Sequence, residues 1–214
     1  MILRFSNLAI VALTAAVWLS GCTVVPERLP PPLTHDLGEQ LNASPLTMPA
    51  VTVVVSAQAP SWLNSTAVPY RMPYLDATEL KYYNDTHWIA APVELVSERL
   101  KQRLHNAEPG YSPTGGRQTI YRLELRLEQF EQVFVTPASA EGRIRVHATL
   151  TNARTRERIA QSTVQETVAC PTPDGPGGVQ ALANAAHGAV EQIAQWASAS
   201  VSSVSPHDPR VGEP

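Results

Sequence analysis

The chain has few of the residues that cross-link or strongly charge a protein. Of its 214 residues only two are cysteines, and 16 Lys and Arg stand against 19 Asp and Glu. Two cysteines permit at most one disulfide, so the fold has to be stabilised by its hydrophobic core. A weakly acidic chain without a Lys/Arg cluster is a poor candidate for binding nucleic acid. We expect no nucleic-acid partner.

Motifs for catalysis and for metal binding are missing as well. No two of the six histidines stand at the HxH or HxxxH spacing of a metal site, and no Gly-x-Ser-x-Gly elbow is present. The glycine-rich run 175–178 lacks the Lys-Ser/Thr of a phosphate loop. Three acidic residues are predicted to be strand-surface charges: Glu124, Glu128 and Glu131. We expect no catalytic residue, metal or cofactor, and a hydrolase using His87 or Cys170 is the least favoured alternative.

The N-terminus holds the one long apolar run. Arg4 precedes the apolar segment 8–19, which at about a dozen residues is too short to cross a bilayer as a helix. This pattern is typical of a cleavable export signal. The segment ends in Leu-Ser-Gly-Cys at Cys22, which resembles the bacterial lipobox, where the cysteine carries diacylglyceryl and acyl chains such as palmitate. We predict a signal peptide over 1–21 and a lipid on Cys22, which leaves Cys170 without a disulfide partner.

Proline sets the predicted ends of the domain. Residues 22–49 contain six prolines and show no apolar periodicity, which predicts a lipidated tether without any packed element. A fully extended tether of this length would reach about 80 Å. The Ser/Pro-rich end, 199–214, is predicted to be a disordered tail. The globular domain is then expected over residues 50–198.

Alternation of apolar and polar residues predicts most of a sheet. The β-branched run 51–55 predicts a first strand buried on both faces, and the segment 68–84 predicts a hairpin. Three later segments predict an antiparallel meander: 121–134, 144–150 and 159–168. The apolar positions change parity after Leu127, which predicts a bulge near Gln129.

Two segments show helical periodicity. Apolar residues recur at steps of three or four from Pro92 to about Asn106, and again from Val179 to Trp196. The breaker-rich segment 171–178 is predicted to be the loop before the second helix. Two amphipathic helices on one face of a largely antiparallel sheet make an α+β fold.

Six of the thirteen aromatic residues fall between residues 62 and 88. Tyr and Trp are favoured at protein interfaces, because their rings are apolar and their tips polar. The same residues could instead cap the core of the sheet, and both interpretations stay open. The candidate partner-binding residues are Trp62, Tyr70, Tyr82, Tyr83 and Trp88.

Several segments follow one another in a recognisable order. They are the lipobox, the Pro-rich tether, the Val-rich strand, Tyr82-Tyr83-Asn84-Asp85-Thr86-His87-Trp88 with Pro92, the segment 125–134 and the helix from Gly177 to Trp196. In this order the chain resembles the ABC-type transport auxiliary lipoproteins, which include the lipoprotein of the paraquat-inducible intermembrane transport system. The resemblance covers about residues 48–198.

The resemblance implies an accessory subunit without enzymatic activity. Such lipoproteins act beside an inner-membrane permease and a mammalian-cell-entry (MCE) domain protein that bridges the periplasm, and the cargo is phospholipid or another apolar molecule. The resemblance further implies an outer-membrane location facing the periplasm and a ring-like homo-oligomer. Thr23, where many inner-membrane lipoproteins carry Asp, agrees with outer-membrane sorting. Cys22 is the one site residue that transfers from the family.

We therefore expect a membrane-anchored accessory lipoprotein that docks the bridging component of an MCE-type lipid transport system. The alternative is a structural lipoprotein that assists assembly of another cell-envelope complex.

Overall fold

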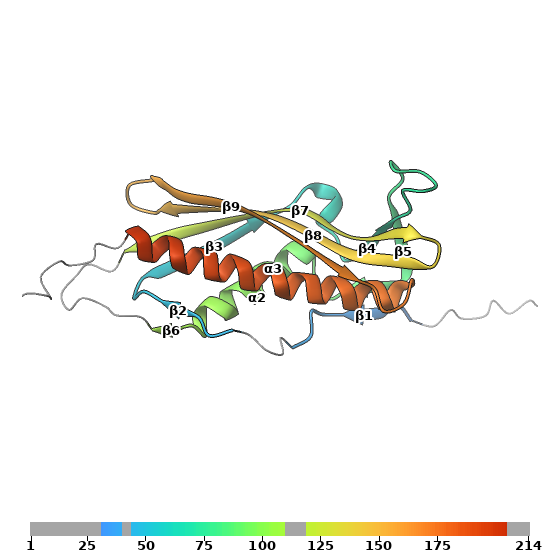
Figure 1. Cartoon of the computed structure of the whole chain (residues 1–214), viewed down its shortest axis with the longest axis horizontal. Coiled ribbons are helices and arrows are strands. Elements are labelled where there is room, and N and C mark those ends of the chain that lie inside the picture. The colour runs from blue at the N-terminus through green and yellow to red at the C-terminus, as the bar shows by residue number, and fades with distance from the viewer. Residues whose placement is uncertain (1–30, 40–43, 110–118, 205–214) are drawn as a thin grey trace, which may run out of the picture. The chain divides into compact units, whose positions relative to one another are not determined.

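The structure is a computed structural model that describes residues 31–39, 44–109 and 119–204. These residues form a seven-stranded mixed sheet with two α-helices on one of its faces (Figure 1), so the predicted α+β class is confirmed. The predicted signal peptide, Cys22 and residues 205–214 lie outside the described residues.

The elements alternate along the chain as the periodicity suggests. In order they are β1 (Leu33–His35), β2 (Thr47–Met48), β3 (Thr52–Gln58), the 3₁₀ turn η1 (Ser61–Leu63), β4 (Ala67–Arg71), β5 (Lys81–Trp88), α2 (Pro92–His105), β6 (Glu108–Pro109), β7 (Ile120–Thr136), β8 (Ser139–Asn152), β9 (Arg158–Ala169) and α3 (Gly175–Val204). The main sheet has the order β1-β5-β4-β7-β8-β9, with β3 also paired to β7, and β2 and β6 form a separate two-stranded ribbon.

The meander β7–β8–β9 is antiparallel, as predicted. Along β7 the side chains alternate between buried and exposed up to Leu127, because successive residues of a strand point to opposite faces. The register with β8 then shifts between Leu127 and Gln129, so the predicted bulge is confirmed. The shift lets Phe130 be fully buried, although it would face solvent in an uninterrupted strand.

The predicted hairpin is also present, since β4 and β5 pair antiparallel. Both β3 and β4 run parallel to β7, with β3 along its first half and β4 near its end. The sequence did not indicate these parallel pairings. The prediction that the first strand is buried on both faces is wrong, because Val54 on β3 is 49% exposed. One face of β3 faces the core, and the other faces solvent.

Part of the predicted tether belongs to the domain. β1 adds a parallel strand to β5, and three side chains beyond it are buried in the core: Leu37, Leu46 and Met48. The prediction that residues 22–49 contain no packed element is therefore wrong for the described residues. The prediction failed because three of the prolines stand together at 30–32. The segment from Leu33 to Leu37 contains no proline, so each of its backbone amides can donate a hydrogen bond.

The first helix, α2, has the predicted bounds. Pro92 occupies its first turn, where the missing amide proton costs nothing, and Glu94 in the same turn complements the helix dipole. Its buried stripe contains Val93, Val96 and Leu100.

The second helix, α3, is longer than predicted at both ends. It begins at Gly175, inside the expected loop, because an Asp174 carboxylate oxygen accepts a hydrogen bond from the Gly177 amide at 2.8 Å. It continues to Val204, and Val201 is fully buried, so the expected disordered tail is wrong for residues 199–204. The predicted domain boundary at residue 198 therefore cuts through a helix.

Small residues let α3 lie directly on the sheet. Its buried face is rich in alanine, with Ala181, Ala185 and Ala189 all fully buried. At Gly142 of β8 the approach is so close that a β-carbon would lie 2.7 Å from the backbone of Ala181. The opposite face of the sheet carries polar and charged side chains, as the alternation predicted.

Candidate docking site

The five candidate partner-binding residues do not share one environment. Trp88 is only 1% exposed and packs edge-on against Phe130, with the ring centroids 5.5 Å apart. A side chain buried in this way cannot contact a partner, so the prediction is wrong for Trp88. It lies at the end of β5 and belongs to the hydrophobic core.

Tyr70 and Tyr83 are half-buried, and their side chains hold the hairpin β4–β5 against β7. Their rings lie 4.6 Å apart, and Tyr70 meets Phe134 edge-on at 5.9 Å. The Tyr83 hydroxyl donates a hydrogen bond of 2.8 Å to the Gln132 side-chain carbonyl. Burial raises the pKa of Tyr83, so this hydroxyl stays a donor. Both tyrosines hold the hairpin onto β7, whatever else they contact.

The exposed members are Trp62 and Tyr82, each 40% exposed. Tyr82 lies near the end of the sheet where β4 and β5 are joined by the loop 72–80, which projects away from the helices (Figure 1). The same end of the sheet exposes three further large apolar side chains: Tyr74 at 42%, Leu75 at 68% and Val135 at 49%. We call Tyr74, Leu75, Tyr82 and Val135 the hairpin tip.

The loop that carries the tip is braced by polar contacts. The Arg71 guanidinium lies 3.3 Å from the Glu131 carboxylate and donates to the Ala77 carbonyl at 3.0 Å. The Asp76 carboxylate accepts hydrogen bonds from Thr78, which lower its pKa. Glu131 is only 5% exposed, so its prediction as a surface charge is wrong: the bulge turns it towards Arg71. The tip is therefore presented by an anchored loop.

Leu75 and Val135 could not be recognised as candidates from the sequence. Leu75 lies in a segment without periodicity, and Val135 continues an apolar strand, so neither stands out in the sequence. Only the pairing of β4 with the last third of β7 places both at the same end of the sheet.

Cys170 lies beside Gln132, under the hairpin. The Gln132 side-chain amide contacts the Cys170 sulfur at 3.6 Å and donates to the Asp174 carbonyl at 3.1 Å. Burial raises the pKa of the Cys170 thiol, which keeps the sulfur protonated near neutral pH. A catalytic cysteine needs the opposite shift. The geometry favours a structural thiol.

His87 lies on β5 between Thr34 of β1 and Ala67 of β4. Its Nδ1 atom is buried and has no hydrogen-bond partner among the described residues. Within the same residues, no three His, Cys, Asp or Glu side chains are grouped to hold a metal ion. No hydrogen bond joins His87 to Cys170 in this part of the chain.

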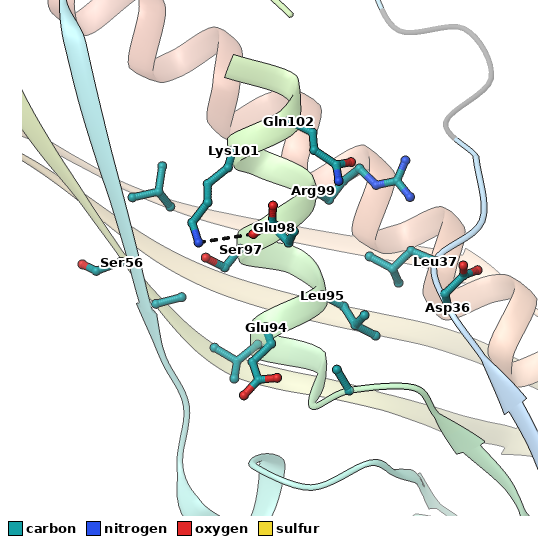
Figure 2. Close-up of a pocket in the computed structure, with 14 residues that line it drawn as sticks. Asp36, Leu37, Ser56, Glu94, Leu95, Ser97, Glu98, Arg99, Lys101 and Gln102 are labelled. Atoms are coloured by element: carbon teal, nitrogen blue, oxygen red, sulfur yellow. Dashed lines mark hydrogen bonds and ion pairs between the residues drawn. The ribbon is translucent and has the colours of Figure 1, made fainter. Parts of the chain in front are cut away.

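A second exposed feature lies between α2 and β3, and we call it the α2–β3 groove. Its cavity of about 680 Å³ is lined by Val55, Ser56 and Ala57 of β3 and by α2 residues between 93 and 102. It extends past α2 to Asp36, Leu37 and Ala90. Figure 2 shows Glu94 on its rim and Lys101 directed at Glu98, with which it forms an ion pair of 3.3 Å. A neighbouring cavity of about 680 Å³ continues along the same pair of elements to Val53 and Leu104. No pattern in the sequence indicated this groove.

Among the described residues no helix combines the length and the apolarity needed to cross a bilayer. The predicted lipid on Cys22 is untested by the structure, because that residue lies outside the described part.

Comparison with known proteins identifies a family and a fold. The family model described as the ABC-type transport auxiliary lipoprotein component matches residues 36–194. No curated protein matches the chain. The solved structure of a Xanthomonas campestris protein shares the fold with a TM-score of 0.65 at 13% identity, covering 81% of this chain and 95% of that one. An uncharacterised protein of known structure has a TM-score of 0.56 at 13% identity, covering 79% of this chain and 100% of that one.

Proposed function

The chain belongs to the family of ABC-type transport auxiliary lipoproteins, and on that premise we propose that it docks an MCE-domain, periplasm-bridging protein at the outer membrane. The proposed cargo of the whole system is phospholipid or a similar apolar molecule, delivered with an inner-membrane permease. The chain itself would act as a binding subunit and not as an enzyme. Family membership places it among the lipoproteins of the bacterial cell envelope.

The hairpin tip is the observation that carries the docking proposal. It places four large apolar side chains at one end of the sheet, each at least 40% exposed. Exposed aromatic and aliphatic side chains grouped on a braced support are typical of protein-binding surfaces. The hydrogen bonds of Arg71, Asp76 and Tyr83 keep the loop ordered before a partner arrives, so little conformational entropy is lost on binding.

The proposed anchor is a short one. Ten residues, 23–32, separate the predicted lipidated Cys22 from β1, whereas the sequence suggested a tether ending at residue 49. Ten residues span at most about 36 Å when fully extended. The domain would therefore meet its partner close to the membrane surface.

The environments of Cys170 and His87, the two residues that the hydrolase alternative would use, support a role without catalysis. Cys170 is a thiol whose pKa is raised by burial, and His87 has a buried ring nitrogen without a described partner. Substituting Cys170→Ala and His87→Ala tests this directly. Loss of cellular function in a variant that folds normally would contradict a pure binding role.

The docking proposal is tested by site-specific photo-crosslinking in the native envelope. A photoreactive residue in place of Tyr82 or Leu75 should crosslink the MCE-domain protein, identified by mass spectrometry. The matched control places the same residue at Gln161, which is exposed on β9. Tyr83 is a poor test position, because its ring and hydroxyl hold the hairpin together.

The double variant Tyr82→Ser/Leu75→Ser should weaken co-purification of the bridging protein while leaving the circular dichroism spectrum unchanged. Equal crosslinking from Tyr82 and Gln161 would reject the tip as the docking surface. Recovery of lipopolysaccharide-transport or barrel-assembly proteins would instead support the assembly alternative. Crosslinks between two copies of the chain would test the proposed homo-oligomer in the same experiment.

A further inference from the structure

Within the described part of the chain, one edge of β3 has no hydrogen-bonding partner. Among the described residues it pairs with β7 alone. The Thr52 amide donates to the Thr119 carbonyl at 3.1 Å, which directs Thr52 towards β7. Because backbone groups alternate in direction along a strand, Val53, Val55 and Ala57 direct their amides and carbonyls to the free edge.

This edge carries none of the features that usually protect an exposed strand. The sequence of β3, Thr-Val-Val-Val-Ser-Ala-Gln, has no charge and no proline, and its register with β7 is uninterrupted. Proteins usually guard long edges with charges, prolines or bulges, because a free edge recruits other strands. The two end strands of the sheet differ: β1 is only three residues long, and β9 carries Arg158 and Glu166.

The edge and the α2–β3 groove together fit one extended peptide. The side chains of Val53, Val55 and Ala57 face the core side of the sheet and stay partly exposed beside α2. A strand added to the edge would direct alternate side chains into the groove, whose cavity lies in the size range of ligand-binding clefts. Its backbone would meanwhile bond to the outward groups of β3. Strand addition beside a helix is an established mode of peptide recognition.

The rim charge indicates one feature of the peptide. Glu94 is exposed on the groove rim and forms no ion pair among the described residues, whereas Glu98 is paired with Lys101. The other charged lining residues, Asp36 and Arg99, lie on the side of α2 away from Ser56 (Figure 2). A Lys or Arg of the peptide would be complementary to Glu94, at the end of the groove near Ala57.

A second copy of this chain fits the groove less well. Its own Val53, Val55 and Ala57 are already packed against its own core, so pairing two β3 edges would satisfy the backbone and leave both grooves without inserted side chains. The occupant that fills both the edge and the groove is a segment whose inward side chains are not already buried.

We propose that β3 and α2 form a peptide-binding site that takes an extended segment of a partner protein by strand addition, with apolar side chains alternating into the groove and a basic residue beside Glu94. This site is distinct from the hairpin tip, and the proposal does not depend on the partner being an MCE-domain protein.

The test uses the full-length lipidated protein in detergent micelles. A displayed library of random linear peptides is selected against it, and an enriched peptide is synthesised with a fluorescent label. We expect enriched sequences to share an alternating β-branched or aliphatic pattern and a Lys or Arg. Binding should slow hydrogen exchange at the amides of Val53, Val55 and Ala57, which a peptide lying elsewhere would leave unchanged.

Two variants locate the binding mode. Ala57→Pro removes one outward amide while sparing the bonds to β7, and should weaken peptide binding about tenfold. Its matched control, Ala57→Ser, keeps the amide and should bind like the unmodified protein. Glu94→Gln removes the charge of an exposed residue that forms no ion pair among the described residues, so it should fold normally and weaken a basic peptide about threefold.

Several results would overturn the proposal. They are a failure to enrich any peptide, peptides that leave the three amides unprotected, and equal binding by the Ala57→Pro and Ala57→Ser variants. Protection of the same amides without peptide, together with a concentration-dependent dimer in sedimentation, would assign the edge to a second copy. Crosslinking at the hairpin tip can succeed or fail independently of all these results.

Discussion

Substituting Gly142→Ala should destabilise the protein strongly, because α3 rests on β8 at this point with no room for a side chain. The added β-carbon would lie 2.7 Å from the Ala181 carbonyl carbon and 2.7 Å from the Leu182 nitrogen. Both are backbone atoms of a helix, so neither can rotate away. Carbon contacts are comfortable from about 3.5 Å, so the helix would have to retreat by roughly 0.8 Å.

The magnitude follows from that displacement. A gap of this size loses about a quarter to a half of the attraction between facing atoms, and overpacking a tight core costs about 1–3 kcal/mol. We expect a loss near the upper end, about 2–3 kcal/mol, because the helix must move as a unit. For a domain of this size that corresponds to a fall in Tm of about 5–10 °C.

Gly188→Ala is the matched control. Gly188 lies inside α3, but the atoms nearest to a β-carbon there would all belong to the Glu166 side chain, starting with its carboxyl carbon at 3.1 Å. That side chain can shift, and replacing glycine by alanine inside a helix stabilises it by about 0.5–1 kcal/mol. Its Tm should stay the same or rise slightly.

The assay is thermal and urea unfolding of both variants, followed by far-UV circular dichroism. A Gly142→Ala protein whose Tm lies within a degree of the unmodified protein would refute the close approach of α3 to β8. So would an equal loss in Gly188→Ala, because that result would make any added methyl group harmful.

Three further predictions concern the core and the helix ends. Arg103→Ala should cost about 3 kcal/mol in urea unfolding, because Arg103 is 8% exposed and its guanidinium lies 2.7 Å from the Glu191 carboxylate, so the substitution breaks a largely buried ion pair; a loss under about 0.5 kcal/mol would contradict this. Burial, and then Arg99, lowers the pKa of His187, so the folded state disfavours its proton. The stability due to neutral His187 is complete above the unfolded pKa and falls as the pH drops towards the folded pKa. Between pH 7.5 and pH 5 the unmodified protein should therefore lose more unfolding free energy than His187→Gln, and parallel curves would reject the shift. Removing residues 199–214 deletes fully buried Val201 and should cost about 1.5–3 kcal/mol, measured by urea unfolding, whereas an unchanged midpoint would show that the last turns add nothing.

The candidate docking residues show where prediction from sequence works and where it stops. The clustering of aromatic residues between 62 and 88 correctly indicated an aromatic-rich hairpin, but composition could not separate its roles. Trp88 is buried against Phe130 and Tyr83 is held by Gln132, while Tyr82 is exposed. The burial of Trp88 and the hydrogen bond of Tyr83 each depend on a residue of β7 that is more than forty positions away in the chain.

Much of the secondary structure could be predicted from the sequence alone, because it depends on residues that are close together in the chain. Alternation along β7 and β8, the parity change after Leu127 and the three-to-four spacing after Pro92 each involve neighbouring residues, so each could be predicted from short segments. The predictions of an export signal and of a lipobox at Cys22 likewise rest on local patterns.

The tertiary structure decided what depends on distant neighbours. The addition of β1 to β5, the parallel pairing of β3 with β7 and the burial of Glu131 against Arg71 each join segments far apart in the chain. No local periodicity specifies which strand lies beside which, because the hydrogen bonds of a sheet are made between segments and their free energy depends on the packing of the whole. The edge of β3 is free because, among the described residues, the sheet continues outward from β4 through β5 and β1, and no strand pairs with the outer side of β3.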